Sequence, residues 1–369
     1  MGFPSKNTGV DCHFLLKGIL ILNHFRLLWG QKLNFSWISK GTVDRVLHNR
    51  GEVSKKSYEK VMRVIEELGY EPNLYASLLA SNRSYTVAAL LPDAAPGEFW
   101  EISRRGLDIS ANDLRVPGVN IVHVGYDQYD GASFAAACDR VLAMQPDGVV
   151  LAPMYRQEAL SFTAKLAAAH IPYVYVDSKL EEDNYLAYFG MPMHKSGYLC
   201  ADLLTQGRRI PSVLIVRIRR PDEDRYDPNV GRRAGFLDYM LEHSPECSVH
   251  YLFIDPTKPG EIGPMLSEFH TKHPEVRNLV MFNSRIYLLV PFLEKSGLKD
   301  LRVVGFDNLD ANVNAVRRGA VNILIAQHPD QQVANAIETL VEYIALRKTP
   351  ACRDNLMHMD ILTRYNIDE

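Results

Sequence analysis

The sequence predicts an α/β protein with two lobes, each a doubly wound parallel sheet, and a small all-helical segment before them. From residue 85 onward, short apolar runs alternate with longer amphipathic stretches, which is the pattern of repeated βαβ units. The runs are apolar at almost every position, so both faces of their strands are expected to be covered. A chain of 369 residues is long enough for two or three domains with their own cores.

The first predicted helix covers residues 39–51, with the sequence SKGTVDRVLHNRG. Ser39 is a favourable N-cap because its hydroxyl can accept a hydrogen bond from an unpaired amide of the first turn. Val43, Val46 and Leu47 fall three to four positions apart and form one apolar stripe. The glycine at the end of the segment is expected to stop the helix.

A second predicted helix is capped by Ser54, ends at Gly69 and is kept from resuming by Pro72. Its predicted buried side consists of Tyr58, Val61, Met62, Ile65 and Leu68. Residues 39–63 hold seven Lys and Arg against three acids, whereas the whole chain has a formal charge of −3. A basic helical pair on a slightly acidic protein is typical of nucleic-acid binding. The alternative is a basic face that is simply solvated.

The remaining elements follow from the alternation of apolar runs with amphipathic stretches. Strands are predicted at 86–92, 120–126, 148–153, 172–177, 185–189, 212–217, 250–254, 279–283, 301–306 and 323–327. Helices are predicted at 98–114, 131–144, 157–169, 194–207, 229–243, 262–273, 287–296, 308–318 and 329–347. We expect one lobe to contain about 85–178 plus 308–324, and the other about 179–307 plus 325–369.

The composition excludes several classes of protein. Apolar content of 47% and charged content of 23% are ordinary for a globular chain. Five scattered cysteines without a C-x-x-C spacing indicate reduced thiols in the cytoplasm, and neither a disulfide framework nor a zinc site. The twelve histidines show no metal-ligand spacing, and the motifs G-x-S-x-G, H-E-x-x-H, P-loop and G-x-G-x-x-G do not occur. We therefore expect neither an enzyme nor a cofactor.

Residues 1–38 differ in character from the rest of the chain. Residues 13–29 are apolar but are interrupted by Lys17, His24 and Arg26. A membrane span needs about 20 apolar residues, so this stretch is too short and too interrupted to predict one. The segment also lacks the small-x-small cleavage site of an export signal.

The strings SKGTVDRVLHNRG, VSKKSYEKV and LGYEPN closely resemble the DNA-binding headpiece of the lactose-repressor/purine-repressor (LacI-type) family. The resemblance continues through almost all of residues 39–369. It implies a helix-turn-helix headpiece at 39–72, a hinge at 73–84 and a periplasmic-binding-protein-like effector domain at 85–369. It also implies a cytoplasmic, ligand-responsive repressor that binds operator DNA as a homodimer. No leucine-heptad tail follows Thr363, so dimers are expected in place of tetramers.

The resemblance assigns roles in DNA binding. Lys40 falls at the start of the recognition helix, and Arg45 matches the arginine that contacts a base in the major groove. The expected phosphate contacts are Thr42, His48, Asn49 and Ser54. In the hinge, Leu79 matches the leucine wedged between base steps, and Ala76 the small residue that faces the minor groove. An ordinary linker is the alternative for this segment.

The headpiece departs from the family at its beginning. Members normally start with a helix of the type D-V-A-x-x-A-G-V-S, but residues 30–38 here are GQKLNFSWI. Trp37 stands where the tight turn has a glycine, and a positive φ is easily adopted by glycine alone. The first helix of the motif therefore looks replaced, as a shifted reading frame or misassigned start would produce. We expect this polypeptide to bind operator DNA poorly.

Ligands of open parallel sheets bind beyond the carboxyl ends of the strands, so polar residues at those ends are the candidates for effector binding. The candidates are Asp177, Asn283 and Asp307 at strand ends, Arg232 in the family pattern R-x-x-G-F, and Phe99 and Trp100 after the first strand. Arginine and carboxylates bind hydroxyls, and an aromatic face stacks on a sugar, so a sugar or nucleobase-like effector is expected.

Several of these assignments have an alternative. Asp307 could be a helix N-cap, Arg233 could replace Arg232 in the cleft, and the two aromatics could simply pack on their lobe. The competing function is a solute-binding receptor without DNA-binding activity, which the two-lobed architecture and the apolar N-terminus favour. Residues 39–73 argue against a receptor, because a DNA-binding headpiece is useless outside the cell.

Overall fold

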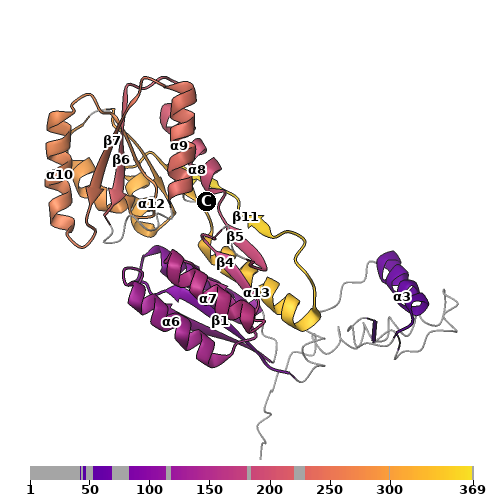
Figure 1. The fold of residues 1–369 in the computed structure, drawn as a ribbon. Helices are drawn as coiled ribbons and strands as arrows, with labels where there is room; N and C mark the ends of the chain where they lie inside the picture. Colours follow the sequence, from indigo (N-terminus) through magenta and orange to yellow (C-terminus); the bar gives the residue numbers. More distant parts are fainter. Residues whose placement is uncertain are drawn as a thin grey trace, which may run out of the picture. The chain divides into compact units, whose positions relative to one another are not determined.

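The computed structural model describes residues 42, 45–46, 53–68, 83–113, 118–180, 184–219, 229–298 and 300–367. The chain divides into two units, Met1–Pro72 and Asn73–Glu369. Figure 1 shows the described helices and strands. Among the described residues, no helix is long and apolar enough to cross a membrane.

In the first unit, helix α3 spans Lys55–Leu68. The Ser57 amide donates a hydrogen bond to Ser54 Oγ at 3.3 Å, so Ser54 is the predicted N-cap. Val46 and Val61 are buried, as predicted, but Tyr58 and Met62 are 45% and 41% exposed. The prediction of a buried side was therefore wrong for these two residues. An apolar stripe shows which side of a helix can be buried, but it does not show how much of that side neighbouring segments cover.

Lobe 1 is a six-stranded parallel sheet with the strand order β11-β5-β4-β3-β1-β2. Its strands are β1 (Tyr85–Pro92), β2 (Val119–Tyr126), β3 (Gly148–Leu151), β4 (Tyr173–Val176), β5 (Ala187–Gly190) and β11 (Asp354–Leu356). Its helices are α5 (Phe99–Asp113), α6 (Gly131–Met144), α7 (Arg156–Ala168) and α13 (Pro329–Leu346). Helices α5 and α13 pack together, as do α6 and α7, and every residue of β3 and β4 is buried. The sheet is therefore covered on both faces.

Lobe 2 repeats this architecture with the strand order β12-β10-β9-β8-β6-β7, in which β12 alone runs antiparallel. Its strands are β6 (Ser212–Ile218), β7 (Ser248–Ile254), β8 (Asn278–Met281), β9 (Arg302–Phe306), β10 (Ile323–Ala326) and β12 (Asp360–Leu362). Its helices are α8 (Met193–Thr205), α9 (Val230–His243), α10 (Pro259–Lys272), the 3-10 helix η1 (Ile286–Leu289), α11 (Val290–Lys295) and α12 (Asp310–Arg317). Two apolar clusters fill the lobe, one containing Leu214 and Ile262 and the other Phe236 and Phe306.

The chain passes between the lobes three times, after β5, after β10 and after β11. The predicted return to lobe 1 over residues 308–324 is wrong, because β10 pairs with β9 and both belong to lobe 2. Residues 179–180 and 184–190, together with helix α13, belong to lobe 1, not to lobe 2 as predicted. The apolar stripe of a helix shows that one side is buried, but it does not show which sheet covers it.

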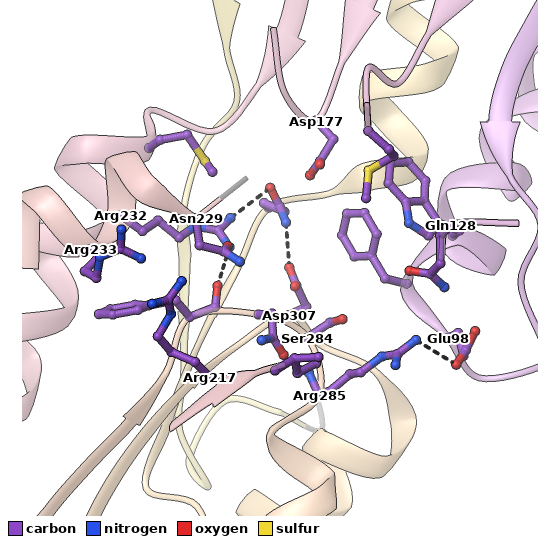
Figure 2. Close-up of a pocket in the computed structure, with 18 of the residues that line it drawn as sticks. Glu98, Gln128, Asp177, Arg217, Asn229, Arg232, Arg233, Ser284, Arg285 and Asp307 are labelled. Atoms are coloured by element: carbon purple, nitrogen blue, oxygen red, sulfur yellow. Dashed lines mark hydrogen bonds and ion pairs between the residues drawn. The ribbon is translucent and has the colours of Figure 1, made fainter. Parts of the chain in front are cut away.

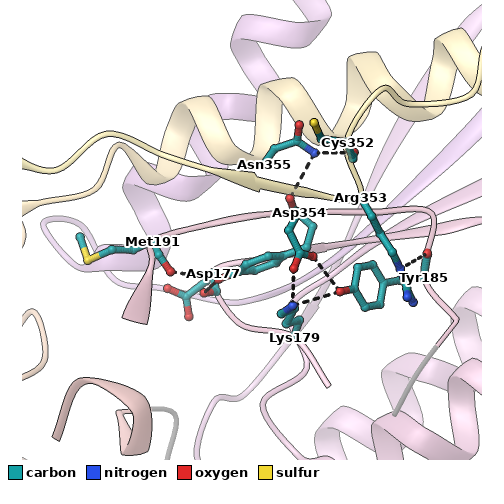
Figure 3. A network of polar contacts seen from close by, with 9 residues as sticks. Asp177, Lys179, Tyr185, Met191, Cys352, Arg353, Asp354 and Asn355 are labelled. Carbon is teal, nitrogen blue, oxygen red and sulfur yellow. Dashed lines mark hydrogen bonds and ion pairs between the residues drawn. The ribbon is translucent and has the colours of Figure 1, made fainter. Parts of the chain in front are cut away.

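The third passage is anchored on lobe 1 by polar contacts (Figure 3). Asp354 of β11 accepts hydrogen bonds from Lys179 Nζ at 2.6 Å and from the Tyr185 hydroxyl at 2.7 Å. The Arg353 guanidinium lies 3.8 Å from the centre of the Tyr185 ring. At the second passage, His328 Nε2 lies 2.6 Å from Asp360 Oδ2, so the second and third passages are joined directly.

The four cysteines within the described ranges are free thiols, which agrees with the prediction for these positions. Burial raises the pKa of Cys138 to about 12 and that of Cys247 to about 11. Nucleophilic attack by cysteine requires the thiolate, so these two thiols are inert at neutral pH.

Candidate functional site

A pocket lies between the two lobes (Figure 2). Its space amounts to about 1090 Å³ when the solvent at its mouth is included. Its walls come from both lobes: Glu98, Phe99, Trp100, Gln128, Tyr129, Met154, Asp177, Met193, Val216, Arg217, Ile218, Asn229, Arg232, Arg233, Phe282, Asn283, Ser284, Arg285, Asp307 and Gln327. Small-molecule sites typically bring a few polar groups together in a concave space, and the polar side chains of this pocket come together in this way.

The carboxyl ends of both sheets supply most of the lining. Asp177 follows β4 in lobe 1, whereas Asn283, Asp307 and Gln327 follow β8, β9 and β10 in lobe 2. A parallel sheet brings its carboxyl ends to one edge, and the two edges face the same pocket. The fold therefore collects side chains that are far apart in the sequence.

Arg232 is 3% exposed and lies in the first turn of α9. Close packing of α8 on α9 fixes its backbone, because a Cβ on Gly197 would overlap the Arg232 carbonyl. Its guanidinium donates to the Phe282 carbonyl at 2.7 Å and to Gln327 Oε1 at 3.3 Å, and stacks 4.4 Å from the centre of the Phe306 ring. A cation held this firmly is pre-organised to face a ligand.

Gln327 joins Arg232 to Asp307. Its Oε1 accepts from the arginine, and its Nε2 donates to Asp307 Oδ1 at 2.8 Å. Asp307 is 3% exposed, and burial raises the pKa of its carboxyl, an effect that Arg232 and the Gln327 hydrogen bond partly offset. A buried carboxyl with a raised pKa beside a buried cation, in a cleft, is a typical feature of a functional site.

Both strand-end aspartates adopt left-handed backbone conformations, with φ of +64° for Asp177 and +67° for Asp307. The Asp177 amide donates to the Phe189 carbonyl at 3.0 Å and to Gln332 Oε1 at 3.1 Å. Gln332 Nε2 in turn donates to the Gln327 carbonyl at 3.0 Å. Aspartate adopts this conformation more readily than most residues other than glycine, and such backbone outliers cluster at active sites and ligand sites.

The mouth of the pocket is bridged by a contact between the lobes. Arg285 Nη2, from the segment after β8, lies 3.1 Å from Oε1 of Glu98, the residue just before α5. These side chains are 12% and 28% exposed. The Arg285 guanidinium also lies 5.3 Å from the centre of the Tyr129 ring of lobe 1. The contact can exist only when the lobes are close together, so it is a contact of the closed pocket.

An aromatic pair and an amide complete the site. The Phe99 and Trp100 rings are 5.1 Å apart, edge to face, and Trp100 is buried in the lobe 1 core. The Asn283 Oδ1 accepts a hydrogen bond from the Arg285 amide at 3.0 Å, which helps to shape the turn that carries Arg285.

Comparison with known proteins identifies the family. Residues 87–348, more than half of the chain, match a periplasmic binding protein domain, and residues 37–73 match the lacI family of bacterial regulatory proteins. A crystal structure classed as a LacI transcriptional regulator from Bacteroides fragilis is 34% identical, with a TM-score of 0.73, and the match covers 78% of this chain and 99% of that one. The chain belongs to the LacI family.

Two curated relatives are regulators of the same family. The HTH-type transcriptional regulator RegA of Clostridium saccharobutylicum is 25% identical over 282 residues, which cover 75% of this chain and 81% of RegA. The HTH-type transcriptional regulator DegA of Bacillus subtilis is 27% identical over 136 residues, which cover 37% of this chain and 39% of DegA. The predictions of the LacI-type family and of the two-lobed fold are therefore confirmed.

All six effector-binding candidates of this LacI-family chain, Phe99, Trp100, Asp177, Arg232, Asn283 and Asp307, line the one pocket. Arg233, the alternative to Arg232, lines it too. The alternative for Asp307 is wrong, because the N-cap of α12 is Leu309 and the Asp307 carboxyl faces Gln327. Gln327 ends a predicted strand, so the rule that selected Asn283 and Asp307 should have found it as well.

The predicted DNA contacts are described only in part. Thr42 and Arg45 are in helical conformation, and Arg45 is exposed. The Ser54 hydroxyl caps α3 and lies 2.9 Å from the Ser57 hydroxyl. Lys40, His48, Asn49, Ala76 and Leu79 lie outside the described residues. The roles of all eight in DNA binding stay predictions.

Proposed function

We propose that this LacI-family protein is a cytoplasmic, ligand-responsive repressor that acts as a homodimer and binds a sugar between its lobes. The observation that carries the proposal is the convergence of Asp177 from one sheet, and of Arg232 and Asp307 from the other side, on one pocket. An enzyme is not expected, because nothing in the sequence marks a catalytic nucleophile or base.

The chemistry of the lining favours a hydroxyl-rich ligand. Arginine side chains can only donate hydrogen bonds and ionised carboxylates can only accept them, whereas a hydroxyl does both. The pocket offers both kinds of group, Arg232 and Arg233 among the donors and Asp177 among the acceptors. Phe99 adds an aromatic face on which the C–H side of a sugar ring can stack. A nucleobase-like ligand is the second choice, because it would use the same groups.

Response to the ligand requires two arrangements of the lobes. A bound sugar that touches both lobes favours the closed arrangement, in which Arg285 pairs with Glu98. The hinge at 73–84 leads directly into β1 of lobe 1. A change in lobe angle would then alter the spacing of two hinge segments in a dimer, and with it the affinity for operator DNA.

For DNA binding, we propose that Arg45 and Lys40 contact bases and that Thr42, His48, Asn49 and Ser54 contact phosphates. A bidentate arginine–guanine contact discriminates bases by about 1–3 kcal/mol. Ala76 and Leu79 are proposed to act in the minor groove. Because the sequence of residues 30–38 departs from the pattern of the family's first helix, we expect weak binding to operator DNA.

Thermal unfolding of the full chain with a panel of monosaccharides, disaccharides and nucleosides tests the ligand site. A ligand at 100 times its Kd stabilises the folded state by about 2.7 kcal/mol, so a binder should raise Tm by several degrees. The shift should disappear in Arg232→Ala and Asp177→Asn. A sugar whose shift survives both substitutions would contradict the proposed site.

The proposed DNA binding is tested with the full chain. DNA duplexes are selected from a random-sequence library, and their binding is then measured by gel shift. Weak retention that falls further in Arg45→Ala is expected. Tight specific retention would contradict the expected effect of the altered N-terminus, and would leave the repressor proposal standing. Sugar binding without any retained DNA, together with recovery of the protein outside the cytoplasm, would favour the solute receptor.

A further inference from the structure

A cluster of side chains in lobe 2, none of which lines the pocket, has the composition of a metal site. We propose that His250, His273 and Glu275 bind a divalent transition-metal ion. One potential ligand atom from each residue lies within 4.8 Å of the other two. The proposal is independent of the pocket and of DNA binding.

Three separate elements bring these side chains together. His250 is on β7, an edge strand of the lobe 2 sheet, and is paired with Leu214 of β6. Side chains alternate along a strand, so His250 projects to the same side as Leu252 and Ile254, which pack in the core that contains α10. His273 follows the last turn of α10, and its amide donates to the Phe269 carbonyl at 2.9 Å. Glu275 is in the connection from α10 to β8.

The distances fit a common ion. His273 Nδ1 and Glu275 Oε1 are 3.6 Å apart. Zinc bonds to nitrogen and oxygen are about 2.0–2.2 Å, which places two ligand atoms at a tetrahedral angle roughly 3.4 Å apart. The imidazole rings of His250 and His273 have centroids 4.4 Å apart and are tilted by 49°. Closing the cluster on an ion therefore needs only small side-chain movements.

A second observation, at His250, also points to a metal ion as the ligand. His250 Nε2 is buried and has no hydrogen-bond partner among the described residues. A buried polar atom without a partner is unfavourable, and coordination would satisfy it. Phe269 packs beside both imidazoles, at 5.6 Å from His250 and 4.8 Å from His273.

The donor set selects the class of ion. Two imidazoles and one carboxylate suit Zn²⁺, Co²⁺, Ni²⁺ or Cu²⁺, whereas Mg²⁺ and Ca²⁺ prefer oxygen ligands alone. Glu275 is exposed, so a further coordination position can be taken by water. A bound ion would tie the edge strand β7 to the end of α10 and stabilise lobe 2, since it binds the folded state and not the separated ligands.

The test titrates the chelator-treated full chain with Co²⁺, whose visible absorption reports coordination geometry, and with Zn²⁺ by calorimetry. We expect one site with a spectrum of nitrogen and oxygen ligands and without the intense thiolate charge-transfer band that a cysteine site would give. Zn²⁺ should also raise the Tm of the protein.

Substitutions locate the site. His250→Ala and His273→Ala should each weaken Co²⁺ binding by more than about 100-fold, and Glu275→Gln should weaken it less. The matched control is His243→Ala, an exposed histidine of the same lobe on α9, which should bind Co²⁺ as the unmodified protein does. Thermal unfolding in the presence of chelator shows whether each variant is folded. If a histidine variant does not fold, the Glu275→Gln variant is used to locate the site. The proposal would be overturned if Glu275→Gln and His273→Ala bound Co²⁺ as tightly as the unmodified protein does. It would also be overturned if the unmodified protein bound no Co²⁺.

Discussion

The floor and the mouth of the pocket are built in different ways. The floor, Arg232–Gln327–Asp307, is buried, and its contacts lie within lobe 2 and the passage that leaves it. The mouth, Glu98–Arg285–Tyr129, is partly exposed and joins one lobe to the other. Contacts within one lobe persist whether the pocket is open or closed, whereas contacts between lobes exist only when it is closed. The floor is therefore suited to recognition of the ligand, and the mouth to control of the rate at which the ligand dissociates.

Removal of the buried arginine should have the largest effect. Arg232→Ala leaves the Phe282 carbonyl without this donor and Asp307 buried without its nearby cation. We expect a loss of about 3–5 kcal/mol in the free energy of unfolding, together with loss of ligand binding. Urea unfolding and calorimetry with the ligand from the thermal screen measure both. Arg233→Ala is the control, and loss of ligand binding in that variant alone would transfer the role to Arg233.

Asp307→Asn should change stability in a pH-dependent way. The pKa of Asp307 is raised in the folded state, so the stability associated with its protonated form is complete below the unfolded pKa of about 3.9 and is lost as pH rises through the folded value. Asparagine cannot ionise and can still accept the Gln327 hydrogen bond. The variant should unfold at a higher urea concentration than the unmodified protein at pH 7, and at nearly the same concentration at about pH 4.

The control for this experiment is Asp108→Asn, which replaces an exposed carboxylate on α5. Its urea midpoint at pH 7 should lie close to that of the unmodified protein, because substitution of an exposed side chain usually changes stability little. A difference for Asp307→Asn that is the same at pH 7 and at about pH 4 would show that the buried carboxyl does not titrate as the structure indicates.

Weakening the mouth should change kinetics more than stability. Glu98→Gln removes one charge of the contact between lobes, and exposed pairs contribute about 0.2–1 kcal/mol. The ligand should dissociate roughly fivefold faster by stopped-flow measurement, with little change in the urea midpoint. Glu101→Gln is matched, since Glu101 pairs with Arg105 inside the same helix. Equal acceleration in both variants would refute a specific role for the mouth.

Tyr129→Leu should have the smallest effect. It removes the aromatic face under the Arg285 guanidinium, an interaction of about 0.5–1 kcal/mol. Ligand dissociation should accelerate about twofold to fivefold, and the double variant with Glu98→Gln should be less than additive because both act through Arg285. Full additivity would show that the two contacts are independent.

The sequence predicted the individual elements well, because each apolar run or stripe is a local property. The predicted helix at 131–144 coincides with α6, and the strand predicted at 86–92 differs from β1 by one residue. The rule that ligands bind at the carboxyl ends of strands selected Asp177, Asn283 and Asp307, which all line the pocket. Whether a residue lies at the end of a strand can likewise be predicted from the sequence without knowledge of distant contacts.

The rest depended on contacts between distant segments. Gln332 joins Asp177 to Gln327 from the first turn of α13, and nothing local to that helix marks it. The histidines of the proposed metal site come from a strand and a helix end, so no ligand spacing exists in the sequence. The strands β11 and β12 were missed because they are three residues long and lie in a polar segment with few β-branched residues.

These two short strands have a consequence for the whole chain. β11 covers the open edge of β5 in one sheet, and β12 covers the open edge of β10 in the other. A premature stop codon or a proteolytic cut just before Asp354 would therefore uncover both sheets at once, and unpaired edges invite aggregation. The edges of both sheets are therefore protected from pairing with other protein molecules only after the ribosome has completed the chain.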